Sequence, residues 1–148
     1  MAERRLQLED VVNLPGITHY VPQQVRFARE DAHMWYLAGD TDPDTLVLWE
    51  HDLQTKQRRV VMSAQEVTYT PEEILRRERQ RVRFDGITAY QVGRRGDDRV
   101  FLAAVGGRIL VKVGDRPAVS VPGVDGVEDP ALLDDGRRAV YVRGGDLY

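Results

Sequence analysis

The feature of this sequence that most constrains its fold is a succession of short apolar runs separated by turn residues. The runs are rich in β-branched and aromatic residues, and acidic or glycine-containing turns divide them. Because a parallel crossover needs about a dozen residues or more, connections this short favour antiparallel hairpins. We expect strands over 25–28, 34–38, 46–51, 59–62, 87–92, 100–104, 109–113, 118–121, 131–133, 139–142 and 147–148.

An internal repeat runs through these strands. The segments 25–37, 90–102 and 130–142 each contain a strand, a polar or glycine turn, and a second strand with an aromatic residue near its middle. The second and third copies start about forty residues apart, which is the period of four-stranded propeller blades. An insertion lengthens the gap between the first and second copies. We therefore expect an all-β fold, a partial β-propeller of about two and a half four-stranded antiparallel blades with one inserted Arg-rich α-helix.

The insertion carries the signals of one α-helix over about 70–84. Thr70 and Glu73 fit a capping box, and Pro71 suits the first helical position. Gly86 is placed to end the helix. The apolar side chains form only a narrow stripe, so we expect the helix to lie on the surface or at the rim of the sheets. We expect its main anchors to be Ile74, Leu75 and Val82.

Arginines are the most distinctive feature of this helix. They gather toward its negative end, at positions 76, 77, 79, 81 and 83. One interpretation is a solvated surface helix held by ion pairs. The other is a rod that presents guanidinium groups to a carboxylate or carbonyl ligand, since the planar guanidinium donates several directed hydrogen bonds. Arg77 and Arg81 lie one turn apart on the same shoulder of the helix.

The sequence lacks the constellations of most catalytic and metal sites. There is no cysteine, which excludes disulfides and thiolate metal sites. Neither Ser63 nor Ser120 lies in a Gly-x-Ser-x-Gly elbow, and the histidines have no triad or zinc-site spacing. A calcium-loop start at 40–44 fails at Thr45 and His51, so we expect an acidic β-turn there. We expect no catalytic residue, no metal and no cofactor in this chain.

Charge and hydropathy narrow the possible partners. A net charge of −3 argues against a general nucleic-acid binder. No window approaches the roughly 18 apolar residues of a membrane span, and residues 1–10 lack the apolar core of a signal peptide. The absence of cysteine fits a reducing compartment. We therefore expect a cytoplasmic chain that binds neither nucleic acid nor membrane.

Three parts of the chain resemble the dipeptidyl peptidase IV family of serine peptidases. The helix at 72–83, Glu-Glu-Ile-Leu-Arg-Arg-Glu-Arg-Gln-Arg-Val-Arg, is followed by Gly-Ile-Thr-Ala-Tyr at 86–90. This pair is similar to the Glu-Glu-x-Leu-Arg-Arg-Glu-Arg helix and Gly-Ile-x-x-Tyr run of the family's bacterial and cytosolic branches. Segments 6–12 and 22–26 resemble the start of the family's propeller, and 129–148 resembles one of its blades.

The resemblance implies an eight-bladed propeller followed by an α/β-hydrolase domain with a Ser-Asp-His triad. Residues 1–148 would be the N-terminal segment of that propeller, with the catalytic domain absent. The glutamate pair that binds the free amino end of a peptide substrate would also be absent, since Glu72 and Glu73 are not that pair. The resemblance further implies that Arg81, with Arg77 one turn before it, contacts a backbone carbonyl of the substrate.

The expected function is that of a non-catalytic propeller segment, whose parent enzyme would cleave N-terminal dipeptides from peptides. One alternative is a stand-alone partial propeller that acts as a protein-interaction module. Another is a small-ligand or nucleic-acid binder that uses the Arg helix. An open set of blades leaves sheet edges and faces uncovered, so we also expect self-association into dimers or larger assemblies.

Overall fold

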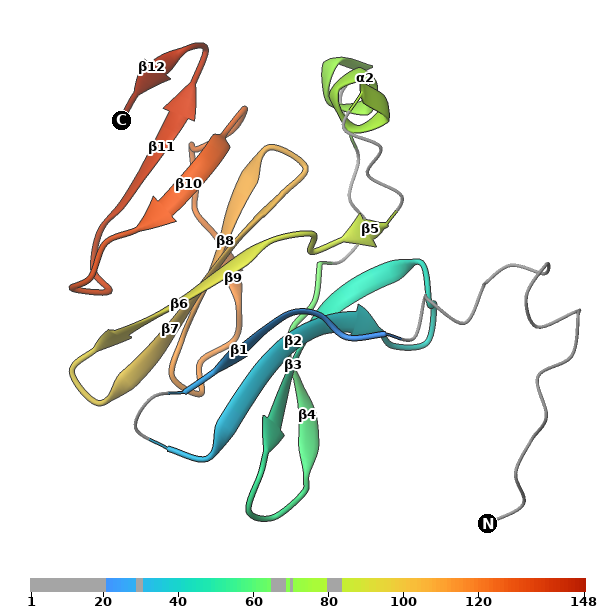
Figure 1. Ribbon diagram of the computed structural model, residues 1–148. Coiled ribbons are helices and arrows are strands. Elements are labelled where there is room, and N and C mark those ends of the chain that lie inside the picture. Colours follow the sequence, from blue (N-terminus) through green and yellow to red (C-terminus); the bar gives the residue numbers. More distant parts are fainter. Residues whose placement is uncertain (1–20, 29–30, 65–68, 70, 80–83) are drawn as a thin grey trace, which may run out of the picture.

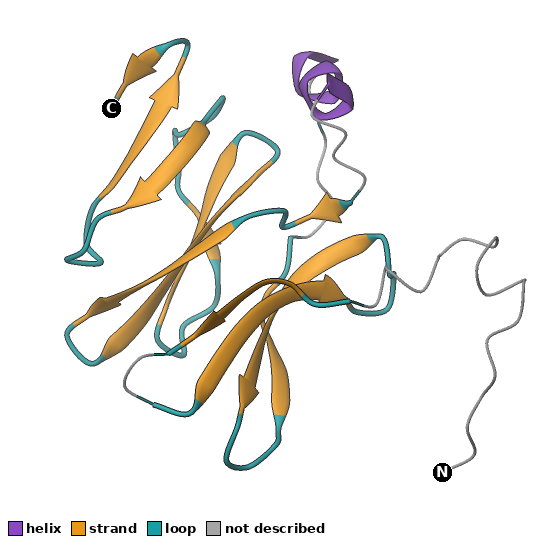
Figure 2. Ribbon diagram, in the orientation of Figure 1, coloured by secondary structure: helices purple, strands orange, loops and turns teal. Residues whose placement is uncertain are grey.

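The computed structural model describes residues 21–28, 31–64, 69, 71–79 and 84–148. The described chain is mostly β, with three antiparallel sheets and one short helix (Figure 1, Figure 2). The sheets follow one another across the molecule in chain order, and the helix lies outside them, above β5 in this view (Figure 1). The all-β class and the single inserted helix expected from the sequence are confirmed for this part of the chain.

Each sheet is a meander in which consecutive strands pair as neighbours. The first sheet has the order β1-β2-β3-β4 and the second the order β6-β7-β8-β9, while the third has the order β10-β11-β12. The short strand β5 joins the first sheet by pairing in parallel with β3. The strands are β1 (Gln23–Phe27), β2 (His33–Gly39), β3 (Thr45–Asp52), β4 (Arg58–Met62), β5 (Asp85–Gly86), β6 (Tyr90–Arg95), β7 (Asp98–Val105), β8 (Arg108–Val113), β9 (Val119–Ser120), β10 (Glu128–Leu132), β11 (Ala139–Arg143) and β12 (Asp146–Leu147).

The expected strand over 87–92 is wrong at its start. The chain pairs with β3 over β5, the Ile87 amide donates to the Leu46 carbonyl at 2.9 Å, and β6 begins only at Tyr90. The side chain of Ile87 is fully buried between the first two sheets. An apolar run at this point therefore marks a buried crossing between sheets, which periodicity alone does not separate from a strand.

The second sheet is packed on both of its faces. Phe101 and Ala103 of β7 belong to the core shared with the first sheet, where the Phe101 ring meets Trp35 edge-on at 5.9 Å between centroids. Leu102, between them in sequence, belongs to the core shared with the third sheet, together with Val127. Because successive side chains of a strand point to opposite faces, β7 contributes to both cores at once. The three sheets are therefore stacked face to face.

Polar contacts tie the first strand of each sheet to the first strand of the next. The Tyr90 hydroxyl on β6 lies 2.8 Å from the Gln24 carbonyl of β1 and 2.9 Å from the Trp35 carbonyl. Burial raises the pKa of Tyr90 to about 12, so this hydroxyl keeps its proton and donates it. On the other face, the Gln91 amide donates to the Pro130 carbonyl and accepts from the Leu132 amide, both at 2.7 Å.

The repeat seen in the sequence is present in the backbone. Positive φ values occur at Gln24 (50°) and Asp129 (45°). Each of these residues comes directly before a copy of the repeat, at 25–37 and at 130–142. Each lies where the pairing of its strand shifts register. Gly96 and Gly136 close the equivalent hairpins with φ values of 63° and 62°. A left-handed residue at a bulge and another at a turn thus recur at matching positions of the repeat.

The helix α2 (Pro71–Arg79) begins at the expected proline. Ile74 and Leu75 are each 48% exposed, which confirms a surface position and shows that these two side chains are not the main anchors. The other predicted anchor, Val82, and the cap residue Thr70 lie outside the described residues. The polar contacts described below hold the helix instead, because half-exposed apolar side chains contribute only part of their transfer free energy.

Candidate functional site

Arg77 of α2 is the predicted ligand-contacting residue that the structure describes. Its side chain is 14% exposed, and its Nη2 donates to the carbonyl of Phe84 and to Asp85 Oδ1, the latter at 3.1 Å. The guanidinium also lies over the ring of Tyr69, 4.2 Å from its centroid. Arg77 therefore joins the helix to the chain on either side of it.

Arg76 extends the helix contacts to the third sheet. Its Nη1 lies 3.4 Å from Glu128 Oε1 at the start of β10, and both side chains are partly exposed. An exposed pair of this kind contributes little to stability, about 0–1 kcal/mol. Arg81 lies outside the described residues, so the predicted pairing of Arg81 with Arg77 on one shoulder stays a prediction.

A second cluster of arginines lies in a cleft between β1 and β6, which we call the inner cleft. It has a volume of about 620 Å³ and is lined by residues that include Arg26, Arg94, Arg99, Asp31, Asp134 and Trp35. Arg99 pairs with Asp31 and stacks on the Trp35 ring, 4.5 Å from its centroid. Arg26 lies over the ring of Tyr90, at 5.6 Å.

The inner cleft carries three guanidinium groups against two carboxylates. Stacking on Trp35 and Tyr90 orients the guanidiniums of Arg99 and Arg26, and Arg99 uses an N–H to pair with Asp31. A planar guanidinium is suited to a carboxylate or a backbone carbonyl. Sequence reasoning concentrated on the helix and missed this cluster. The available signal was the placement of arginines in the strands of consecutive repeat copies, which the fold brings together only once β1 lies beside β6.

Other predicted features occupy ordinary structural positions. Asp42 accepts from the Thr45 hydroxyl at 2.6 Å and the Asp44 amide at 3.0 Å, and these bonds lower its pKa. The acidic β-turn expected at 40–44 is confirmed. Within the described ranges, no group of His, Asp or Glu side chains could hold a metal ion. The described helix is too short and polar to cross a membrane.

Neither serine has the surroundings of a nucleophile. Ser63 and Ser120 are both exposed and line a groove on the outer side of the first two sheets. His33 pairs instead with Asp31, with 3.0 Å between Nδ1 and Oδ1. No hydrogen bond joins a serine to a histidine among the residues that the structure describes, so the geometry assembles no nucleophile and base there.

Comparison with known proteins adds no assignment: no family model matches the sequence, and no curated protein matches it. The functional evidence therefore comes from the structure itself. It consists of the arginines of α2, the arginines of the inner cleft and the stacking of the sheets.

Proposed function

We propose that this chain is a non-catalytic N-terminal segment of the β-propeller of a dipeptidyl-peptidase-IV-like serine exopeptidase. The observation that carries the proposal is the succession of meanders whose first strands are tied together by Tyr90 and Gln91. In a propeller, four-stranded antiparallel sheets pack face to face around a central channel. The double-sided packing of the second sheet supports the same reading.

The proposal gives the inner cleft a role in holding peptide. If the first strands line the central channel, Arg26 and Arg94 place guanidinium groups, which suit carbonyl and carboxylate groups, beside a peptide within it. Arg81 remains the proposed contact to a substrate carbonyl, as the resemblance implies. The bonds of Arg77 to Phe84 and Asp85 then position α2, which precedes Arg81 in the sequence.

The catalytic part of the proposal has a direct test. Incubated with an X-Pro chromogenic dipeptide, the 148-residue chain is expected to show no turnover, because neither serine lies in a Gly-x-Ser-x-Gly elbow and neither is hydrogen-bonded to a histidine among the described residues. Turnover that persists through repurification and disappears in Ser63→Ala or Ser120→Ala contradicts a non-catalytic segment. For the parent enzyme, reading the gene downstream of the Tyr148 codon is decisive. A continuing frame with a Gly-x-Ser-x-Gly elbow supports the peptidase, whereas a stop codon rejects it.

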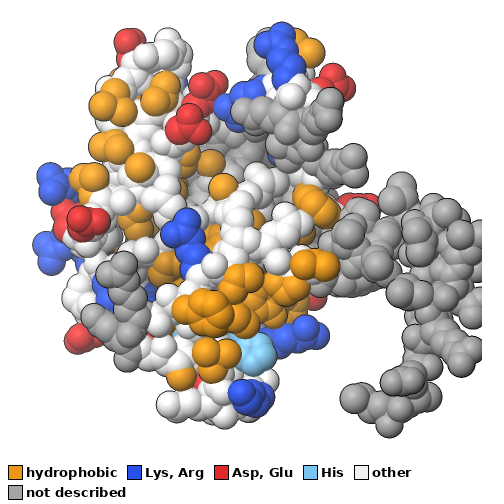
Figure 3. Space-filling view, viewed as in Figure 1, with side chains coloured by type: hydrophobic (Ala, Val, Ile, Leu, Met, Phe, Trp, Pro, Cys, Tyr) orange, Lys and Arg blue, Asp and Glu red, His pale blue; other side chains and the backbone are white. Residues whose placement is uncertain are grey.

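The alternative function is a partial propeller that acts as a protein-interaction module. It is favoured by the apolar outer face of the first sheet, where Phe27 pairs with Met34 and Trp49 pairs with Val60. Phe27 is 64% exposed. Figure 3 shows hydrophobic side chains gathered on the side of the molecule that carries this sheet. A large apolar patch of this kind typically marks an interaction surface.

Self-association is expected under either function. The exposed apolar residues at the two ends of the stack, Phe27 and Leu147, lie on the first and third sheets, so one copy can cover another. Multi-angle light scattering over micromolar concentrations should show dimers or larger species. Phe27→Glu should shift this distribution toward monomer, while Gln54→Glu, an exposed turn substitution, should leave it unchanged. A stable monomer at every concentration rejects the expectation.

A further inference from the structure

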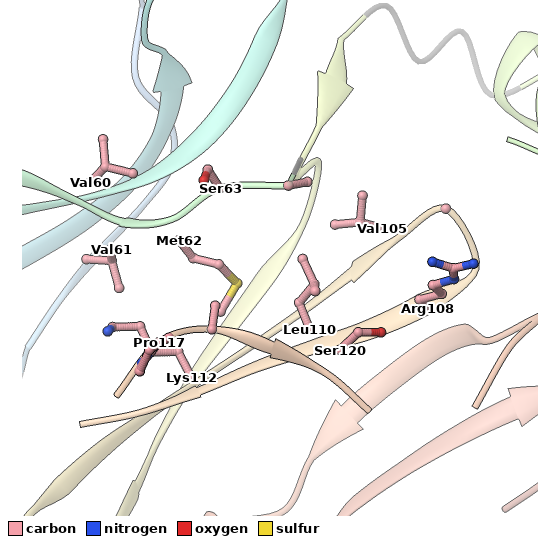
Figure 4. A pocket seen from close by; sticks show the side chains of 13 residues that line it. Val60, Val61, Met62, Ser63, Val105, Arg108, Leu110, Lys112, Pro117 and Ser120 are labelled. Carbon is pink, nitrogen blue, oxygen red and sulfur yellow. The ribbon is translucent and has the colours of Figure 1, made fainter. Parts of the chain in front are cut away.

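A groove runs along the outer side of the first two sheets, which we call the outer groove. It lies between β4 and the β8–β9 pair and has a volume of about 540 Å³. Figure 4 shows Met62 and Val61 of β4 facing Leu110 and Pro117 of the second sheet across it. A groove of this volume falls within the usual range of ligand sites, roughly 300–1,000 Å³.

The charges along the outer groove have one sign. Within the described part of the chain, its lining includes Arg108 and Lys112 and no carboxylate. Arg108 Nε lies 3.2 Å from Asp125, an exposed pair at the rim. Lys112 Nζ donates one hydrogen bond, to the Arg116 carbonyl at 2.6 Å. An ammonium has three donors, so Lys112 retains donor capacity for an anionic group in the groove.

Strand edges form the long sides of the outer groove. Among the residues that the structure describes, β4 pairs only with β3 and β9 only with β8, so each presents an outer edge there. Backbone N–H and C=O groups on such an edge recruit an added strand, and alternate side chains of that strand then enter pockets beside it. The apolar lining of Leu110, Pro117 and Ala118, none of which is fully buried, supplies such a surface.

We propose that the outer groove binds an extended peptide that carries alternating apolar side chains and an acidic end. The peptide adds as a strand to the outer edge of β4, its apolar side chains lie against Leu110 and Pro117, and its carboxylates pair with Lys112 and Arg108. No aromatic side chain lines the groove, so nucleic-acid bases have no stacking surface there. This site is separate from the inner cleft, and it does not depend on the peptidase assignment.

The test uses a fluorescein-labelled octapeptide of alternating valine and threonine that ends in two glutamates. Its binding to the 148-residue chain is followed by fluorescence anisotropy. Lys112→Glu is expected to weaken binding at least about tenfold, because it replaces a charge-assisted hydrogen bond with repulsion. The matched control is Lys56→Glu. Lys56 is the other lysine of the sequence and lies in the exposed β3–β4 turn, so this variant should bind as the unaltered chain does.

Two changes in the peptide complete the test without altering the protein. N-methylation of alternate backbone nitrogens should weaken binding at least about tenfold if the peptide adds as a strand. Replacement of the two glutamates by lysines should do the same if the groove selects acidic ends. These peptide arms also decide the matter if Lys112→Glu does not fold by circular dichroism.

Three results overturn the proposal. The first is equal binding by the Lys112→Glu and Lys56→Glu variants when both are folded. The second is equal binding of the methylated and unmethylated peptides. The third is absence of peptide binding; if Lys112→Glu then also converts an oligomer to monomer, the outer groove is an interface between copies. The gene-reading test of the proposed function is unaffected by any of these results.

Discussion

Gly136→Ala is expected to separate the third sheet from the second and to lower the free energy of unfolding by at least about 2 kcal/mol. Gly136 lies in the turn between β10 and β11 with a φ of 62°, a left-handed conformation that disfavours residues with a Cβ. An added Cβ would overlap the backbone carbonyl of Arg94 on β6. The added Cβ is attached to turn backbone and the Arg94 carbonyl belongs to strand backbone, and neither can shift aside as a flexible side chain does. The second and third sheets must therefore move apart.

Gly96→Ala is the matched control for this change. Gly96 occupies the same place in the preceding repeat copy with nearly the same φ, but nothing lies within 4 Å of an added Cβ. Its cost should be only that of the left-handed backbone, about 1 kcal/mol. Urea unfolding followed by circular dichroism measures both variants, and hydrogen exchange over 128–148 detects release of the third sheet. Equal losses in the two variants contradict close packing of Gly136 on Arg94.

Trp35→Ala is expected to lower the free energy of unfolding by about 3–5 kcal/mol. The Trp35 side chain is 3% exposed and belongs to the core between the first two sheets. Its Nε1 donates to Glu50 Oε2 at 2.9 Å, while Glu50 Oε1 accepts from Arg59 Nε at 2.9 Å. Truncation removes the ring contact with Phe101 and leaves the buried Glu50 with one fewer donor.

Trp49→Ala provides the comparison, since Trp49 is the other tryptophan of the sequence. It lies in the same sheet on the opposite face, partly exposed, with the Arg58 guanidinium 5.1 Å from its ring centroid. Its buried Nε1 has no hydrogen-bond partner. We expect a loss of about 1–2 kcal/mol, because less apolar area is removed from the interior. Thermal unfolding followed by circular dichroism should rank Trp35→Ala well below Trp49→Ala, and the reverse order contradicts the assignment of the core.

The local secondary structure of this chain is predictable from its sequence. The strand runs, the glycine turns and the helix start at Pro71 depend on near neighbours in sequence, through period-two alternation, left-handed turn positions and capping. The internal repeat is predictable for the same reason, because its copies carry acidic or glycine residues at the turn between their two strands. The structure places bulge and turn residues at equivalent positions, as at Gly96 and Gly136.

The candidate sites were only partly predictable. The helix of arginines was visible, but the bonds of Arg77 to Phe84 and Asp85 show that one of its guanidiniums is used within the chain. The expectation that Ile74 and Leu75 anchor the helix was wrong. An apolar stripe on a helix shows which side would be buried if a surface were available, but not whether a neighbouring sheet comes near enough to cover it.

The sequence by itself determined most of the strands, the antiparallel hairpins that join consecutive strands and the position of the helix, because each follows from contacts between residues close along the chain. It did not determine the parallel pairing of β5 with β3, which joins distant segments. Only the tertiary structure decided which faces are covered. Stacking of the sheets assigns Phe101 and Leu102 to different cores, brings Arg26 and Arg94 into the inner cleft and leaves the outer groove open. These outcomes depend on how sheets that are distant in sequence pack against one another, and no local sequence pattern specifies that packing.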